Sequence, residues 1–271
     1  MRLGISSYTF VWGIGVPGYP LPPRPMTAHD LLERADALGV RVVQIADNLS
    51  LDRLADADLA ALRLSAEQKQ MDLEVGTCGI DPANLNTHLR LAQYFKSPIV
   101  RVVLDTTGHQ PTPDEVVPAL LSVLPAFERA GVCLAIENHD RFPSATLAEI
   151  LDRLDSQCAG ICLDTANSLG CLEDVETVLE VLGPRTVNLH IKDFQVFRPR
   201  HQKGFIIEGR PAGGGQLDIP RLLARLRALG RDPNAILELW PPPEADSAAA
   251  AAKEEVWAAE SVRYLRRLIP D

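Results

Sequence analysis

The sequence has 271 residues, of which 46% are hydrophobic and 23% are charged, as is typical of a soluble globular protein with one large core. Its length is close to the roughly 250 residues of a typical TIM barrel. The formal net charge of −9 would repel a phosphate backbone and so argues against a nucleic-acid partner. We find no apolar stretch of signal-peptide length and no run of about 18 apolar residues, so we expect a cytoplasmic protein without a membrane partner.

Eight short apolar runs, separated by amphipathic stretches of helix length, predict repeated βα units and a parallel sheet. The runs are residues 3–8, 40–46, 73–78, 99–104, 132–136, 160–163, 187–191 and 235–239. Thr27 can cap the first long helix, and we expect helices to end at Gly39, Gly131, Gly183 and Gly230, each just before a strand. Eight such units favour a single (β/α)₈ TIM barrel over residues 1–271.

Two segments lie outside this repeat. Residues 11–26 are rich in Pro and Gly and too long for a tight connection, so we expect a lid over the barrel mouth or a strap along the surface. In the alanine-rich residues 247–268, the helical spacing of Val256, Ala259, Val262 and Leu265 predicts a final helix with this face on the barrel. Because apolar helix faces of barrels often pack between subunits, a homo-oligomer stays open.

Functional residues of a (β/α)₈ barrel lie at the carboxyl ends of its strands. The last four predicted strands end in, or contain near their ends, Glu137, Asp164, His190 and Glu238. Buried carboxylates are costly when unpaired, and one divalent cation would remove that cost for all of them. Three carboxylates and an imidazole suit manganese best and would also accept magnesium, cobalt or zinc. The alternative is that these residues only pair with Lys192, Arg101 or helix ends.

Five stretches carry a family resemblance: AIENHDRF, GICLDTANSLG, NLHIKDF, EGRPAGGGQLDIP and AILELW. In this order and at this spacing they resemble the xylose isomerase-like TIM-barrel superfamily of sugar (phosphate) isomerases and epimerases, over essentially the whole chain. The resemblance implies metal ligation by Glu137, Asp164, His190 and Glu238. It also implies that the metal grips adjacent oxygens of a hydroxy-ketone while Glu137 and Glu238 move a proton through an enediolate.

One position departs from the family pattern and bears on the substrate. Many epimerases of the superfamily carry a His three residues after the Asp of the sixth strand, where this sequence has Asn167, which cannot shuttle a proton at neutral pH. We expect Asn167 and His139 to contact the substrate. The segment after the seventh strand concentrates basic residues, and we interpret Lys192 and Arg210 as contacts to a carboxylate or phosphate.

The sequence therefore predicts a divalent-metal-dependent isomerase or epimerase that acts on a small keto sugar or sugar acid. A decarboxylase of a 3-oxo sugar acid such as 3-oxo-isoapionate is the alternative, because loss of carbon dioxide produces the same kind of enediolate. An endonuclease IV-like DNA-repair enzyme is a distant alternative, since it needs additional histidines and two of the six here, His29 and His88, fall in predicted helices. A barrel that binds a metal or sugar without catalysis is the remaining interpretation.

Overall fold

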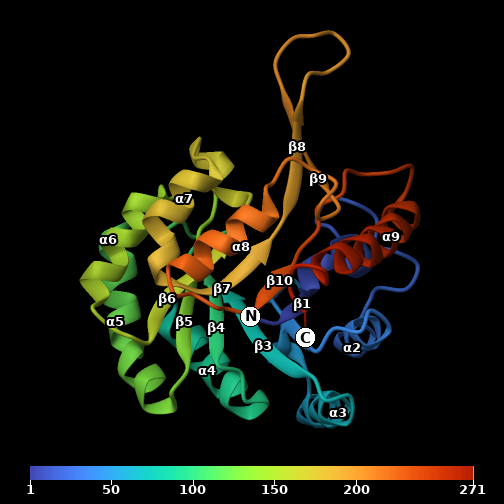
Figure 1. Ribbon diagram of the computed structural model, residues 1–271. Coiled ribbons are helices and arrows are strands. Elements are labelled where there is room, and N and C mark those ends of the chain that lie inside the picture. Colours follow the sequence, from blue (N-terminus) through green and yellow to red (C-terminus); the bar gives the residue numbers. More distant parts are fainter. Residues whose placement is uncertain (271) are drawn as a thin grey trace.

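A computed structural model describes residues 1–270 (Figure 1). Eight parallel strands close into a barrel in the order β1-β10-β7-β6-β5-β4-β3-β2. These strands are β1 (Leu3–Ser6), β2 (Val42–Ile45), β3 (Asp72–Cys78), β4 (Ile99–Val103), β5 (Cys133–Glu137), β6 (Ala159–Asp164), β7 (Thr186–Ile191) and β10 (Ala235–Leu237). Each of the eight predicted apolar runs overlaps one barrel strand, and the predicted TIM barrel is confirmed.

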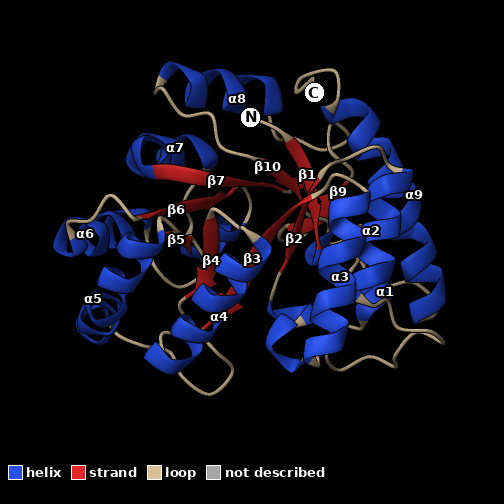
Figure 2. Ribbon diagram, turned by 90° about the horizontal axis from the view of Figure 1, so that it is seen from below, coloured by secondary structure: helices blue, strands red, loops and turns tan. Residues whose placement is uncertain are grey.

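Helices surround the barrel as an outer layer (Figure 2). They are α2 (Ala28–Ala37), α3 (Asp56–Gln68), α4 (Pro82–Phe95), α5 (Pro113–Ala130), α6 (Ser144–Leu154), α7 (Val175–Leu182), α8 (Ile219–Ala228) and α9 (Ser247–Leu265), with a short α1 (Val11–Ile14) after β1. The barrel strands are buried on both faces, so their near-continuous apolar sequences fill one core. Within residues 1–270, none of the helices combines the length and apolar character needed to cross a membrane.

Most of the predicted helix ends follow the expected chemistry. Thr27 caps α2 through the backbone N–H of Asp30, and the side chain of Asp30 accepts from the Thr27 backbone in return. Gly39, Gly131 and Gly230 follow their helices with φ of +69°, +65° and +70°, a conformation that glycine adopts at little cost. Gly183 also ends its helix, but with a right-handed φ of −50°, and the chain continues into a 3₁₀ turn.

The predicted apolar face of the last helix is only partly correct. Val256 is 56% exposed, whereas Ala250, Ala258 and Glu254 are buried on α9. The carboxylate of Glu254 accepts the backbone N–H groups of Trp12, at 2.9 Å, and Gly13, at 3.0 Å. The spacing of apolar residues could not reveal this face, because it is built around a buried acidic group that holds the start of α1.

The proline-rich segment 11–26 lies against α9. Besides the contacts of Trp12 and Gly13, the hydroxyl of Ser247 donates to the backbone carbonyl of Pro20. This position fits the predicted surface strap, and closure of the segment as a lid stays a prediction.

A β-hairpin leaves the barrel between β7 and α8. Its strands, β8 (Asp193–Phe197) and β9 (Ile206–Arg210), pair antiparallel, with Asp193 opposite Arg210 and Phe197 opposite Ile206. Figure 1 shows the hairpin rising well beyond the helices. Because β8 follows the carboxyl end of β7, the hairpin stands on the face of the barrel where the functional residues were predicted.

Candidate metal centre and substrate cavity

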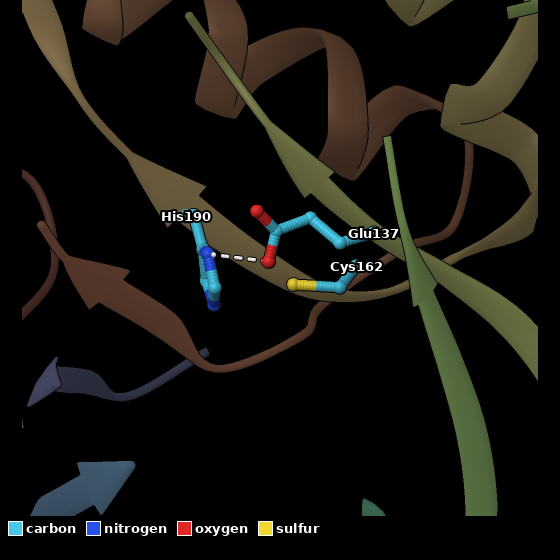
Figure 3. Close-up of side chains that lie close together, drawn as sticks. All are labelled: Glu137, Cys162 and His190. Carbon is cyan, nitrogen blue, oxygen red and sulfur yellow. Dashed lines mark ion pairs between the residues drawn. The ribbon is translucent and has the colours of Figure 1, made fainter. Parts of the chain in front are cut away.

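The four predicted ligands converge inside the barrel mouth. The side chains of Glu137, Asp164, His190 and Glu238 are each at most 2% exposed. Nδ1 of His190 lies 3.3 Å from Glu137 Oε2, 3.4 Å from Glu238 Oε1 and 3.8 Å from Asp164 Oδ2. Figure 3 shows the ring of His190 and the carboxylate of Glu137 facing each other across this space. The structure thus brings the four side chains together, and their role as ligands stays a prediction.

Two cations border the cluster. The guanidinium of Arg101, itself buried, donates through Nε to Glu137 Oε2 and through Nη1 to Asp47 Oδ1 at 2.9 Å. Nζ of Lys192 lies 2.8 Å from Asp164 Oδ2 and 2.9 Å from Glu238 Oε2. The pairing with Arg101 and Lys192 considered from the sequence therefore occurs. It leaves three clustered carboxylates facing two cations.

These cations and His190 decide the ionisation of the two glutamates. Burial by itself raises the pKa of Glu137, but the positive charges of Arg101, His190 and Lys192 outweigh burial and lower that pKa to about 2. Burial likewise raises the pKa of Glu238, and the charges of His190 and Lys192 bring it below its usual value. Both glutamates are therefore carboxylates at neutral pH, as metal ligation requires.

Three buried atoms of the cluster have few partners within residues 1–270. His190 Nδ1 has no hydrogen-bond partner, and Asp164 Oδ2 and Glu238 Oε2 have the ammonium of Lys192. One nitrogen and two oxygens, all buried and close together, could therefore bind an ion. Ligand atoms of Asp164, His190 and Glu238 lie within 4.8 Å of one another, a spacing that one ion can bridge.

The protonation of His190 is set from the opposite side of its ring. Nε2 of His190 lies 2.7 Å from Gln44 Oε1, and the amide nitrogen of Gln44 donates to Glu74 Oε2 at 3.0 Å and Asn188 Oδ1 at 3.1 Å. Because both amide hydrogens of Gln44 are used, its oxygen accepts and Nε2 of His190 carries the proton. Nδ1 is then the ring nitrogen that faces the three carboxylates, at 3.3, 3.4 and 3.8 Å, and the one placed to bind an ion. The residues therefore fit a divalent metal.

Cys162 is a further polar group beside the cluster. Its Sγ lies within 4.8 Å of ligand atoms of Glu137 and His190. Figure 3 shows the Cys162 side chain beside these two residues. Burial raises the pKa of Cys162 well above its usual value, and its Sγ–H donates to Asn188 Oδ1 at 3.4 Å. A protonated thiol is a poor ligand, so the oxygen and nitrogen donors are better suited to hold the ion.

A cavity of about 420 Å³ opens beside the cluster. Its lining includes three predicted substrate contacts, His139, Asn167 and Lys192, together with Tyr8, Leu239 and Trp240. Asn167 links the cavity to the cluster, because its Nδ2 donates to Glu137 Oε1 at 2.8 Å while its Oδ1 lies 3.4 Å from Lys192 Nζ. The cavity therefore offers polar groups on the cluster side and apolar walls elsewhere, as small-molecule sites do.

Arg210, the fourth predicted substrate contact, lies on β9 and is not part of the cavity lining. Its guanidinium donates to Glu208 Oε2 at 2.9 Å and to Gln195 Oε1 at 3.0 Å, both within the hairpin. The structure therefore does not bring Arg210 to the cluster, and a contact with substrate stays a prediction. Of the two predicted basic contacts, Lys192 is the one at the site.

Known proteins share the sequence pattern that surrounds this cluster. The family model described as "Xylose isomerase-like TIM barrel" matches residues 32–268. The chain belongs to this family. The 3-oxo-isoapionate decarboxylase of Pectobacterium atrosepticum is 33% identical over 265 residues, which cover 98% of this chain and 95% of that protein.

Solved structures share the fold of this xylose isomerase-like barrel. A D-psicose 3-epimerase crystallised in the presence of D-fructose superposes with a TM-score of 0.75 at 15% identity and full coverage of both chains. The IOLI protein with a bound zinc atom superposes with a TM-score of 0.71 at 17% identity, again over both full chains. At these identities the similarity establishes the fold alone.

Several residues of this xylose isomerase-like site were missed by reasoning from the sequence. Gln44, Glu74, Asn188, Cys162 and Ser6 all lie in barrel strands, and the hydroxyl of Ser6 donates to Glu238 Oε1 at 2.8 Å. A signal was present in most cases, because each polar side chain interrupts an apolar run. Cys162 stands two residues before Asp164 and so shares its face of β6.

Proposed function

We propose that this protein is a metal-dependent decarboxylase that acts on a small 3-oxo sugar acid. The observation that carries the proposal is the buried cluster of three carboxylates and one histidine beside a cavity that Lys192 lines. A cation on the cavity wall favours an anionic substrate over a neutral sugar. The relative from Pectobacterium, which matches almost the whole chain, supports the same reaction class.

The predicted ligands Glu137, Asp164, His190 and Glu238 would hold the metal, with manganese as the expected ion and magnesium, cobalt or zinc as substitutes. When bound, a divalent cation polarises the keto oxygen of the substrate and stabilises the negative charge that develops there. The remaining chemistry belongs to the side chains around the cavity.

In the proposed reaction, the bond between the substrate carboxylate and the neighbouring carbon breaks and carbon dioxide leaves. The electron pair of that bond passes into the ketone, giving an enediolate or enolate, and the same carbon then takes up one proton. Lys192 is the cationic group on the cavity wall, so we assign it the orientation of the anionic substrate and delivery of this proton. Asn167 and His139 would bind hydroxyl groups, while Tyr8, Leu239 and Trp240 limit access of water.

Decarboxylation suits the contacts of Glu137 better than isomerisation does. Isomerisation requires a carboxylate that is free to remove a proton from carbon. Glu137 is a weak base here, because Arg101 and Asn167 donate to its oxygens and nearby cations lower its pKa to about 2. Loss of carbon dioxide needs no base of this kind, because the departing bond itself supplies the electrons.

An isomerase or epimerase of keto sugars is the second candidate. One observation favours it: Glu137 and Glu238 each approach Nδ1 of His190 with one oxygen, at 3.3 and 3.4 Å, so two carboxylates lie close to the same reaction space. A DNA-repair activity gains no such support. His29 and His88 lie on α2 and α4, as expected from the sequence, and are not among the residues of the cluster.

A comparative assay tests the two reactions together. The chelated protein is incubated with ketoses and 3-oxo sugar acids, with and without manganese, while carbon dioxide release and isomer formation are followed. We expect metal-dependent carbon dioxide release from a 3-oxo sugar acid. Incorporation of solvent deuterium without carbon loss would instead establish the isomerase, and activity indifferent to metal would refute both.

Matched variants separate the site from general damage. Glu238→Gln removes a predicted ligand and is expected to abolish turnover. Glu244→Gln alters an exposed glutamate that pairs with Lys253, and it should retain wild-type activity.

A further inference from the structure

The end of the hairpin, residues 198–207, exposes apolar side chains that the chain itself does not cover. Phe205 is 65% exposed, and Ile206 and Ile207 are exposed beside it. Figure 1 shows the far end of the β8–β9 hairpin extending beyond the helices. A two-stranded hairpin is marginally stable on its own in water, and clustered exposed apolar groups mark interaction sites.

The charge of the hairpin end is opposite to that of the whole protein. Residues 198–207 contain Arg198, Arg200 and Lys203 and no carboxylate, whereas the chain carries a formal net charge of −9. The guanidinium of Arg198 lies 4.6 Å from the ring centre of Phe205, so the positive charge lies directly beside the exposed apolar surface. Such a surface fits a partner that offers an apolar contact flanked by acidic groups.

The same end of the barrel carries a surface of that kind, which we call the rim patch: Leu172, Asp174, Glu176 and Glu180. Leu172 is 95% exposed and has a left-handed φ of +61°, so a large apolar side chain stands free in a turn. The three acidic residues follow at the start and along the outside of α7, and Glu176 pairs with Arg221 at 2.8 Å. Because α7 follows β6, its start and the hairpin lie on the same face of the barrel.

We propose that two copies of this chain form a two-fold dimer in which the hairpin end of each packs on the rim patch of the other. Phe205 and Ile206 would cover Leu172, while Arg200 and Lys203 would face Glu176 and Glu180. A two-fold axis makes both contacts at once, so each copy covers its hairpin end and its rim patch together. The dimer would form whether or not the barrel holds a metal.

The dimer would also steady one wall of the cavity. Ile207 belongs to both the hairpin end and the cavity lining. Further along β9, Gly209 passes so close to Trp240 that a Cβ at this position would lie 2.4 Å from the Trp240 carbonyl oxygen. Residues that line the cavity are thus attached to the arm, and loss of the partner should raise the KM for substrate more than it lowers kcat.

Solution mass measurements test the dimer on the full-length protein. Light scattering after size exclusion and sedimentation velocity should give the wild type twice the 29.6 kDa mass of the chain. Phe205→Glu and Leu172→Glu should each convert it to a monomer. Leu64→Glu, which changes a comparably exposed leucine on α3, should leave the dimer intact.

A charge exchange distinguishes this arrangement from any other association. One protein carries Arg200→Glu and Lys203→Glu, and a second carries Glu176→Lys and Glu180→Lys. Each should be monomeric alone, whereas their mixture should form a mixed dimer because both contacts then join opposite charges. A monomeric wild type, a dimer that survives Phe205→Glu and Leu172→Glu, or a mixture that stays monomeric would each overturn the proposal.

Discussion

Gln44 Oε1 accepts a hydrogen bond from His190 Nε2 at 2.7 Å inside the closed barrel. The contact matters because Glu74 and Asn188 occupy both amide hydrogens of Gln44, so its oxygen must face the histidine. Asn188 also donates to Glu74 Oε2 at 2.9 Å, and Asn234 donates to Glu74 Oε1 at 2.8 Å. A buried glutamate two side chains away thus orients the group that sets the tautomer of His190.

Replacement of Gln44 should weaken metal binding without removing a ligand. Gln44→Met keeps the length of the side chain but leaves Nε2 of His190 without an acceptor, so we expect manganese affinity to fall by roughly 10- to 100-fold. Calorimetric titration measures this loss. Nitrogen-15 spectra of the metal-free protein should show Nε2 of His190 protonated in the wild type and mixed tautomers in the variant.

Asn84→Ala serves as the control for Gln44, because it removes a half-buried amide that bonds Thr77 and the carbonyl of Cys78. It should keep the wild-type affinity. Equal affinity in Gln44→Met and the wild type would contradict the positioning role. If the nitrogen-15 spectra of the wild type show His190 protonated on Nδ1 and not on Nε2, the proposed hydrogen bond to Gln44 is contradicted, whatever the metal affinity.

Lys192→Met should bind manganese more tightly than the wild type and yet turn over substrate poorly. The ammonium of Lys192 lies within 2.9 Å of one oxygen of Asp164 and one of Glu238, so it competes with an incoming cation. Its removal also takes the positive charge from the cavity wall. Calorimetry and steady-state kinetics should therefore move in opposite directions, while Lys253→Met, which alters a surface pair with Glu244, should change neither.

Arg101→Met should destabilise the metal-free protein strongly. Arg101 is buried between Glu137 and Asp47, and its loss removes the cation that donates directly to the buried carboxylate of Glu137. We expect the free energy of unfolding to fall by about 3–5 kcal/mol, as for other broken buried pairs. Urea unfolding measures the change, and manganese should restore part of the stability of the variant. A variant as stable as the wild type without metal would show that Glu137 does not depend on this pair.

The barrel and the clustering of the four predicted ligands were predictable because both depend on local pattern and topology. Buried parallel strands give continuous apolar runs, and a polar residue that ends such a run, as Glu137 and Asp164 do, must lie at the barrel mouth. Gln44 and Glu74 were not predicted, because they lie within strands and their partners come from other strands far along the chain.

The hairpin and the buried face of α9 escaped prediction for related reasons. The basic residues after the seventh strand do not predict the pairing of residues 193–197 with 206–210, because this pairing depends on a turn that carries no strong short-range signal. On α9, Glu254 is buried only because the backbone of Trp12 and Gly13 comes to meet it. Contacts between segments this distant in sequence lie outside what residue spacing reveals.

Glu254 should make stability depend on pH near neutrality. Burial raises the pKa of Glu254 from its ordinary value of 4.5 to about 8. The backbone N–H groups of Trp12 and Gly13 act in the opposite direction and lower this pKa, but burial outweighs them. The folded state therefore holds a proton that the unfolded state has released between these two values. Its contribution to stability is complete below pH 4.5 and is lost as the pH rises through 8, by at most about 1.4 kcal/mol per pH unit.

Unfolding of the wild type and of Glu254→Gln across this range isolates that contribution. The stability of the wild type relative to the variant should fall as the pH rises from about 5 towards 8 and level off above it, because the amide in the variant does not titrate. Glu260→Gln, at an exposed position further along α9, should follow the wild-type curve. Parallel curves for the wild type and Glu254→Gln would mean that the backbone N–H groups keep this carboxylate ionised throughout, and that α1 is held by a permanent charge.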